Sequence, residues 1–300
     1  MKQVQIGSLL LLATSILAVT GCGGGGESVA IDGSSTVFPV TQAVAEEFKK
    51  VQPKVRVSVG VSGTGGGFKK FIAGTIDICD ASRGIKDSER EKCDKAGVEF
   101  AELEVAFDGL AVIVNPENDW CESLTVDQLK ELWRPESGVK KWSDLNPEWP
   151  AEDIELYGPG TASGTFDYFT KAIVGKEGAS RADYTMSEDD NVLVTGIQAD
   201  KYSLGYFGFA YYLENKDKLK LLGVDNGSGA VKPSEETVRG GTYKPLSRPL
   251  YIYVRTSALK KKQVKDFVDF YMEKGGSLVK EVGYVPVSDE VAARNAEALK

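Results

Sequence analysis

The sequence has no histidine among its 300 residues and only four cysteines. Without histidine, the chain cannot build a Ser-His or Cys-His nucleophilic pair or the common histidine-bearing zinc sites. The glycine-rich residues 62–67 do not form a P-loop either, because Lys69 follows Phe68 and no Ser or Thr comes after the lysine pair. No residue stands out as a catalyst. We therefore expect a protein that is not an enzyme and holds no cofactor or metal.

Basic residues are too few for a nucleic-acid-binding protein. Lys and Arg total 36 against 44 Asp and Glu, which gives a formal net charge of −8. Nucleic acids and anionic membrane surfaces are both recognised through a basic footprint. We therefore expect no nucleic-acid partner, and contact with a membrane only through an anchor.

Long hydrophobic runs are absent except at the N-terminus. Residues 1–22 carry Lys2 near their start and continue with an apolar run over residues 6–19, shorter than the roughly 20 residues of a spanning helix. This order predicts an export signal; the alternative is a core segment with a chance cysteine. Residues 19–22, Val-Thr-Gly-Cys, look like a bacterial lipobox. They predict lipidation at Cys22, a flexible tether over residues 23–27, and a place in the cell envelope, periplasmic or on the outer face of the cytoplasmic membrane.

Three cysteines remain beyond this signal: Cys79, Cys93 and Cys121. Outside the cytoplasm a pair of them tends to oxidise. We predict a Cys93–Cys121 disulfide, because both residues flank polar, loop-like stretches, and we expect Cys79 to be buried in an apolar strand. A Cys79–Cys93 pair is the alternative, since the sequence does not fix the connectivity.

Alternating strand and helix patterns predict an α/β fold. They run from residue 30 to about residue 115, and a second block follows from residue 125. Two strongly apolar strands, at residues 109–115 and 249–255, bracket the second block. We therefore predict two lobes joined by two crossovers that can act as a hinge. One lobe is formed by residues 28–115 with 246–300, and the other by residues 116–245.

Three strand-to-helix turns are rich in Gly, Ser and Thr. They read DGSST at residues 32–36, SGTGGG at residues 62–67 and GTASGT at residues 160–165. One such turn is most simply explained by a side chain, such as Ser163 or Thr165, that caps the following helix. The other interpretation is an anion site, because free amides and the helix dipole meet there, at the carboxyl ends of strands. Three copies at this topological position favour an oxyanion site.

The motifs DGSSTVFP, SGTGGGFKKFIAGTIDICDASRGI and GPGTASGTFDYF together resemble the periplasmic phosphate-binding proteins of bacterial ABC phosphate importers. The resemblance runs from about residue 28 to the C-terminus. It implies a two-lobed periplasmic binding protein fold of type II, a monomer that closes on inorganic phosphate and delivers it to permease subunits. It also implies the phosphate-binding residues, which are Ser35, Thr36, Val37, Thr64, Gly65, Ser163, Gly164 and Thr165.

Two positions depart from the best-known members of that family. Those proteins carry an arginine near residues 158–160, which here are Gly-Pro-Gly, and an aspartate where this chain has Arg83. We predict that Arg83 supplies the missing guanidinium, whose planar fork suits a tetrahedral oxyanion. The displaced aspartate can accept a hydrogen bond from protonated phosphate, which sulfate cannot offer. The sequence leaves three replacements open: Asp32, Asp80 and Asp108.

Other functions remain as alternatives to a phosphate receptor. The same fold can serve sulfate or another tetrahedral oxyanion. A phosphoesterase that uses Ser163 or Thr165 is a further alternative, although the sequence offers neither a base nor metal ligands for it. A third is an adhesion or signalling protein that has kept the fold without the ligand.

Overall fold

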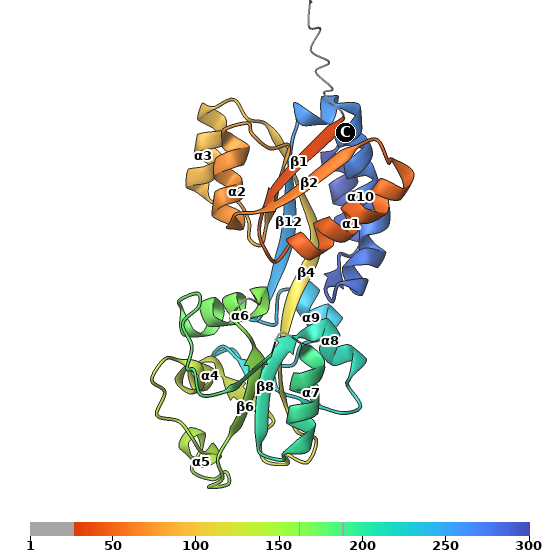
Figure 1. Ribbon diagram of the computed structural model, residues 1–300. Coiled ribbons are helices and arrows are strands. Elements are labelled where there is room, and N and C mark those ends of the chain that lie inside the picture. The colour runs from red at the N-terminus through yellow and green to blue at the C-terminus, as the bar shows by residue number, and fades with distance from the viewer. Residues whose placement is uncertain (1–26, 162, 188) are drawn as a thin grey trace, which may run out of the picture.

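The computed structural model describes residues 27–161, 163–187 and 189–300. Figure 1 shows two lobes stacked end to end, with the strands β4 (Phe100–Val114) and β12 (Ser247–Arg255) at their junction. The predicted lipidation site Cys22 and nearly all of the predicted tether lie outside the described residues. In the described part of the chain, no helix is long and apolar enough to cross a membrane.

The upper lobe in Figure 1, lobe 1, has the strand order β2-β1-β3-β12-β4. Strand β1 (Ser28–Gly33) runs parallel to β2 (Arg56–Val61) and β3 (Ile78–Ala81), whereas β12 is antiparallel to both β3 and β4. The helices of this lobe are α1 (Phe38–Val51), α2 (Gly63–Ile72), α3 (Asp87–Lys95), α10 (Lys262–Glu281) and α11 (Asp289–Ala298), with the 3-10 turn η2 (Ala258–Lys260).

Apolar side chains at helical spacing explain how these helices cover the sheet. On α1, Val40, Val44 and Phe48 are buried, and the Phe48 ring meets Phe267 of α10 edge to face with ring centroids 5.3 Å apart. On the other helical layer, Phe68 and Phe71 of α2 share a cluster with Cys79 and Cys93. Lobe 1 therefore has core on both faces of its sheet.

The lower lobe, lobe 2, continues the same sheet. The second half of β4 pairs antiparallel with β8 (Ser203–Gly208), which is parallel to β6 (Glu155–Pro159), and β7 (Thr185–Ser187) forms the edge. Its helices are α4 (Val126–Trp133), α5 (Trp142–Leu145), α6 (Gly164–Phe169), the π-helical turn η1 (Thr170–Val174), α7 (Asp190–Ala199), α8 (Phe209–Glu214) and α9 (Glu235–Arg239). Short strands complete the fold: β5 (Ser123–Thr125), β9 (Lys220–Leu221), β10 (Gly223–Asp225), β11 (Ala230–Val231) and β13 (Val285–Pro286).

Strand β4 joins the two lobes within one sheet. Its residues up to Gly109 pair with β12, and those from Leu110 onward pair with β8. The predicted α/β fold is thus confirmed. Because β1, β2 and β6 all end toward this junction, the three turns that follow them lie there too. The exact lobe boundaries, residues 28–115 with 246–300 and residues 116–245, stay a prediction.

The predicted Cys93–Cys121 disulfide is wrong. Cys79, Cys93 and Cys121 are all free and buried, with Cys93 in lobe 1 and Cys121 in the core of lobe 2. The stretch around Cys93 is a helix rather than a loop, and this helix turns its cysteine inward against Phe68 and Phe71. Burial raises the pKa of the Cys121 thiol to about 12, so it stays neutral. The expected burial of Cys79 is confirmed.

Candidate functional site

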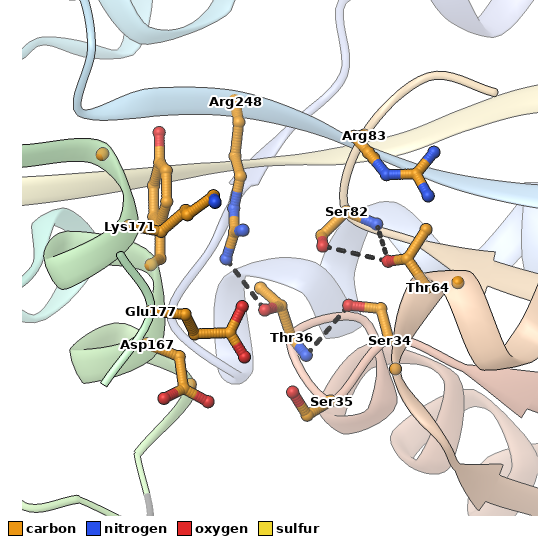
Figure 2. Close-up of a pocket in the computed structure, with 15 residues that line it drawn as sticks. Ser34, Ser35, Thr36, Thr64, Ser82, Arg83, Asp167, Lys171, Glu177 and Arg248 are labelled. Carbon is orange, nitrogen blue, oxygen red and sulfur yellow. Dashed lines mark hydrogen bonds between the residues drawn. The ribbon is translucent and has the colours of Figure 1, made fainter. Parts of the chain in front are cut away.

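The three Gly-Ser-Thr turns meet at a cleft of about 480 Å³ between the lobes. Figure 2 shows side chains from both lobes pointing into it. Of the predicted ligands, the lining includes Ser35, Thr36, Thr64, Gly65, Arg83 and Gly164. The rest of the lining was not predicted: Ser34, Gly63, Ser82, Asp167, Tyr168, Lys171, Ala172, Glu177 and Arg248.

The first turn owes its shape to the glycine that ends β1. Gly33 has φ +153°, and a Cβ atom there would overlap the backbone carbonyl of Asp80. That carbonyl oxygen accepts a hydrogen bond from the Ser34 amide at 2.9 Å, and the Ser34 hydroxyl accepts one from the Thr36 amide at 3.2 Å. The turn is thereby fixed with Ser35 and Thr36 facing the cleft. Val37, which the resemblance implies as a ligand through its backbone amide, is fully buried at the N-cap of α1 and is not among the residues that line the cleft.

The second turn is held from behind by Asp32. Its carboxylate bonds the Ser62 hydroxyl and accepts from the Lys70 ammonium at 2.6 Å. Farther along, a Cβ on Gly67 would come within 2.7 Å of the Gly33 Cα atom, so only glycine lets α2 approach β1 this closely. Thr64 and Ser82 both line the cleft, and the Thr64 hydroxyl accepts a hydrogen bond from the Ser82 amide at 3.2 Å.

In the third turn, Ser163 caps the following helix, as the simpler interpretation of these turns predicts. The Ser163 hydroxyl accepts a hydrogen bond from the Thr165 amide at 3.2 Å and caps α6. Neither Ser163 nor Thr165 lines the cleft, but Gly164 between them does. A Cβ on Gly164 would lie 3.6 Å from the Thr36 hydroxyl oxygen, so the first and third turns face each other closely.

Arg248 at the start of β12 is the arginine that reaches the centre of the cleft. Its Nη2 atom donates to the Thr36 hydroxyl at 2.8 Å and to Asp108 at 3.0 Å, and its Nε atom donates to the same Asp108 oxygen at 3.1 Å. The guanidinium carbon also lies 3.7 Å from the centroid of the Tyr168 ring. The fork of Arg248 is thus held in place while 19% of its side chain stays exposed.

Arg83 also lines the cleft, but its guanidinium is already paired. Its Nη1 and Nη2 atoms donate to the two carboxylate oxygens of Glu89 at 2.8 and 2.9 Å. In Figure 2 the head of Arg83 points away from Thr36 and Arg248. A ligand role for Arg83 therefore stays a prediction, and the geometry favours Arg248 for the guanidinium that the sequence lacks near residues 158–160.

A protein-family model described as a PBP superfamily domain matches residues 18–274. The chain belongs to the PBP superfamily. Protein SphX of Synechocystis sp. is 51% identical over 267 residues, which cover 88% of this chain and 80% of that protein. Phosphate-binding protein PstS of Staphylococcus saprophyticus is 41% identical, over 95% of this chain and 90% of that protein. The resemblance inferred from the three motifs is confirmed.

Solved structures agree with this membership of the PBP superfamily. The crystal structure of a possible phosphate binding protein from Planctomyces limnophilus superposes with a TM-score of 0.87 at 47% identity. The match covers 92% of this chain and 99% of that one. The predicted periplasmic-binding-protein fold is therefore confirmed.

The three aspartates predicted as proton acceptors do not line the cleft of this PBP-superfamily chain. Asp32 is bonded to Ser62 and Lys70, and buried Asp108 is paired with Arg248. Asp80 points into the core of lobe 1, where burial raises the pKa of its carboxyl to about 8. Lys70 and Arg248, the partners of Asp32 and Asp108, come from distant parts of the chain. The sequence therefore did not reveal these contacts.

Two other carboxylates, Asp167 and Glu177, line the cleft from lobe 2. Figure 2 shows both on the side opposite the first turn. Partial burial and the charge of Glu177 raise the pKa of the Asp167 carboxyl, while Arg248 acts in the opposite direction. Asp167 was not predicted as a cleft residue, although it lies in the motif SGTFDYF. The available signal was its position one helical turn after the capping Ser163. No cluster of three metal-ligating side chains occurs among the described residues.

Proposed function

We propose that this chain is an extracytoplasmic receptor that captures inorganic phosphate between its lobes and delivers it to the permease subunits of an ABC transporter. The PstS relative is named a phosphate-binding protein, which supports the substrate class. The observation that carries the proposal is the meeting of three Gly-Ser-Thr turns, from both lobes, with the Arg248 guanidinium at one cleft. Lipidation at Cys22 and a monomeric state complete the proposal.

The cleft offers enough donors for a useful affinity. A dissociation constant of about 1 μM corresponds to about 8 kcal/mol. Hydrogen bonds to a charged group contribute about 1.5–3 kcal/mol each. The hydroxyls of Ser35, Thr36 and Thr64, the free guanidinium edge of Arg248 and the ammonium of Lys171 are available in the lining. One bond from each of these five groups would contribute about 7.5–15 kcal/mol in total, which reaches the requirement before the costs of ordering and desolvation are subtracted.

Calorimetric titration of the purified chain tests this proposal. The protein is first unfolded and refolded to strip any bound ligand, and then titrated with phosphate and with sulfate at several pH values. We expect tight phosphate binding that excess sulfate does not displace. Equal binding of the two anions would indicate a general oxyanion receptor. No heat with either would contradict the proposal and favour an adhesion or signalling role.

Selectivity is proposed to come from Asp167 in place of the aspartates named from the sequence. Two of the cations in the cleft already have carboxylate partners: Arg248 pairs with Asp108, and Arg83 pairs with Glu89. An incoming anion therefore meets Lys171 and the remaining Nη1 edge of Arg248, together with the carboxylates of Asp167 and Glu177. Protonated phosphate can donate a hydrogen bond to a carboxylate, whereas fully ionised sulfate meets only repulsion.

Replacing Asp167 by asparagine is expected to reduce the discrimination between the two anions by about tenfold or more, since a tenfold change corresponds to 1.4 kcal/mol. The amide keeps the size of the side chain but removes the charge that repels sulfate. Competition titrations with both anions measure the ratio of dissociation constants. Glu177→Gln, titrated in parallel, shows how much of the discrimination comes from the second carboxylate of the cleft. An unchanged ratio in Asp167→Asn would contradict the role of Asp167, while wild-type phosphate binding would still support the receptor.

A further inference from the structure

We propose that Tyr168 is a positioning residue, which fixes the plane of the Arg248 guanidinium in the cleft and ties it to helix α6. The inference rests on the proposed function, because its consequence is expressed in phosphate affinity. Tyr168 lies on α6, the short helix that begins with the third turn, whereas Arg248 lies at the start of β12. The tyrosine therefore connects two elements that are 80 residues apart in the sequence and both border the ligand site.

The ring of Tyr168 covers the guanidinium directly. The distance from the Arg248 Cζ atom to the ring centroid is 3.7 Å, and only 7% of the tyrosine is exposed. A guanidinium is attracted to the face of an aromatic ring by the ring quadrupole, and its flat shape stacks well there. Contact at this distance leaves the guanidinium no room to tilt toward the ring.

The other end of Tyr168 is anchored next to the arginine in sequence. Its hydroxyl donates to the carbonyl oxygen of Pro245 at 2.8 Å. Pro245 precedes β12, so the backbone that carries Arg248 is held by the same side chain that packs on the guanidinium. Burial raises the pKa of the Tyr168 hydroxyl, which therefore remains a donor at any physiological pH.

Arg248 needs this second constraint because its other contacts lie along one edge. The Nε and Nη2 atoms bond to Asp108, and Nη2 also bonds to Thr36, but within the described residues no partner for Nη1 is found. A guanidinium held along a single edge can still rotate about it. With Asp108 at one edge and Tyr168 on one face, the plane is fixed and the Nη1 donors are aimed in a constant direction. Misplacing a charged donor by as little as about 1 Å can be costly to binding and catalysis.

Phosphate titrations of ring-free variants test the proposal. In Tyr168→Leu, and in Tyr168→Met as a second variant of different shape, we expect the dissociation constant for phosphate to rise about tenfold. Tyr168→Phe keeps the ring and is expected to stay within about threefold of wild type. The matched control is Phe169→Leu on the next residue of α6, which stacks on Tyr206 in the core of lobe 2 rather than on Arg248. It is expected to lower the melting temperature without changing phosphate affinity.

The outcomes separate a positioning role from a structural one. Loss of affinity in both ring-free variants, rescue by phenylalanine and unchanged affinity in Phe169→Leu support the proposal. Wild-type affinity in Tyr168→Leu or Tyr168→Met overturns it, and so does an equal loss in Phe169→Leu. If the wild-type protein itself does not bind phosphate, the proposed function fails, which is a different result from an unaffected Tyr168 variant of a binding protein.

Discussion

Phosphate binding is expected to fall by about a hundredfold or more when Arg248 is replaced by glutamine, since hydrogen bonds to a charged group contribute about 1.5–3 kcal/mol each. The variant loses the fork that reaches the centre of the cleft and its contact with Thr36. Arg248→Lys restores a positive charge without the planar fork, and we expect it to recover only part of the affinity. Isothermal titration with phosphate measures both variants.

Arg83→Ala is the matched control for Arg248. Both arginines line the cleft, but Arg83 is held by Glu89. We expect the loss in Arg83→Ala to be at least about tenfold smaller, because both Nη atoms of Arg83 already bond to Glu89 and its head points away from Thr36 and Arg248. The reverse order would show that Arg83 is the principal guanidinium ligand, as the sequence predicts.

The same substitution of Arg248 is expected to lower stability, because it leaves the Asp108 carboxylate buried without its partner. Breaking a buried ion pair typically costs about 3–5 kcal/mol. Binding is therefore compared at a temperature where circular dichroism shows each variant to be folded. The double variant Arg248→Gln with Asp108→Asn removes the buried charge, and we expect it to recover stability without recovering phosphate affinity.

A second large effect is expected from Asp80, whose ionisation should weaken the fold as the pH rises. Its carboxyl is fully buried near Thr41 of α1 and Tyr271 of α10, whose hydroxyls are hydrogen-bonded to each other. Neither carboxylate oxygen has a well-aligned hydrogen-bond partner in the described part of the chain, although the nearby Thr41 hydroxyl lowers the pKa somewhat. Burial is the larger effect and raises the pKa to about 8.

The direction of the pH dependence follows from this raised pKa. Between the unfolded value of 3.8 and about 8, the folded chain holds a proton on Asp80 that the unfolded chain has lost. The free energy of unfolding therefore falls as the pH rises through this window, by at most about 1.4 kcal/mol per pH unit, and levels off above it. Asp80→Asn, which cannot ionise, is expected to be free of this fall.

Urea unfolding at pH 5 to 9 measures the effect as the difference in free energy of unfolding between Asp80→Asn and wild type. We expect the difference to grow in favour of the variant up to about pH 8. Asp269→Asn, an exposed aspartate of α10, is the control whose difference from wild type should not change over this range. A constant difference for Asp80→Asn would show that the carboxyl titrates at an ordinary pKa.

The sequence located the parts of the site that depend on local structure. Gly33 and Gly67 are required by close backbone contacts, so the turns they belong to are visible as Gly-Ser-Thr motifs after strands. Arg248 was not visible in this way, because it meets Thr36 only after the chain has returned from lobe 2. Its signal was weaker: an arginine directly before one of the two apolar strands that bracket lobe 2.

The errors have a common physical origin. Cys93 was placed in a loop because its neighbours are polar, but a charged surface helix also has polar neighbours, and α3 buries only its cysteine. Likewise, Asp32 and Asp80 lie near the ends of β1 and β3, and Asp108 lies within β4. Lys70 and Arg248, both remote in sequence, direct the side chains of Asp32 and Asp108, whereas the Asp80 carboxyl is buried without a well-aligned partner among the described residues. Local pattern predicts position along the chain better than the direction of a side chain.

The place of β12 in the sheet has a consequence for the order in which the protein folds. This strand lies between β3 and β4 in the middle of lobe 1, but it is one of the last strands in the chain. Lobe 1 therefore cannot complete its sheet until the chain has been made or exported to about residue 255. The core of lobe 2 is formed largely by residues that precede β12, so lobe 2 can finish folding first. The delay keeps β3 and the first half of β4 without their shared partner, and the cleft is incomplete until Arg248 of β12 is in place.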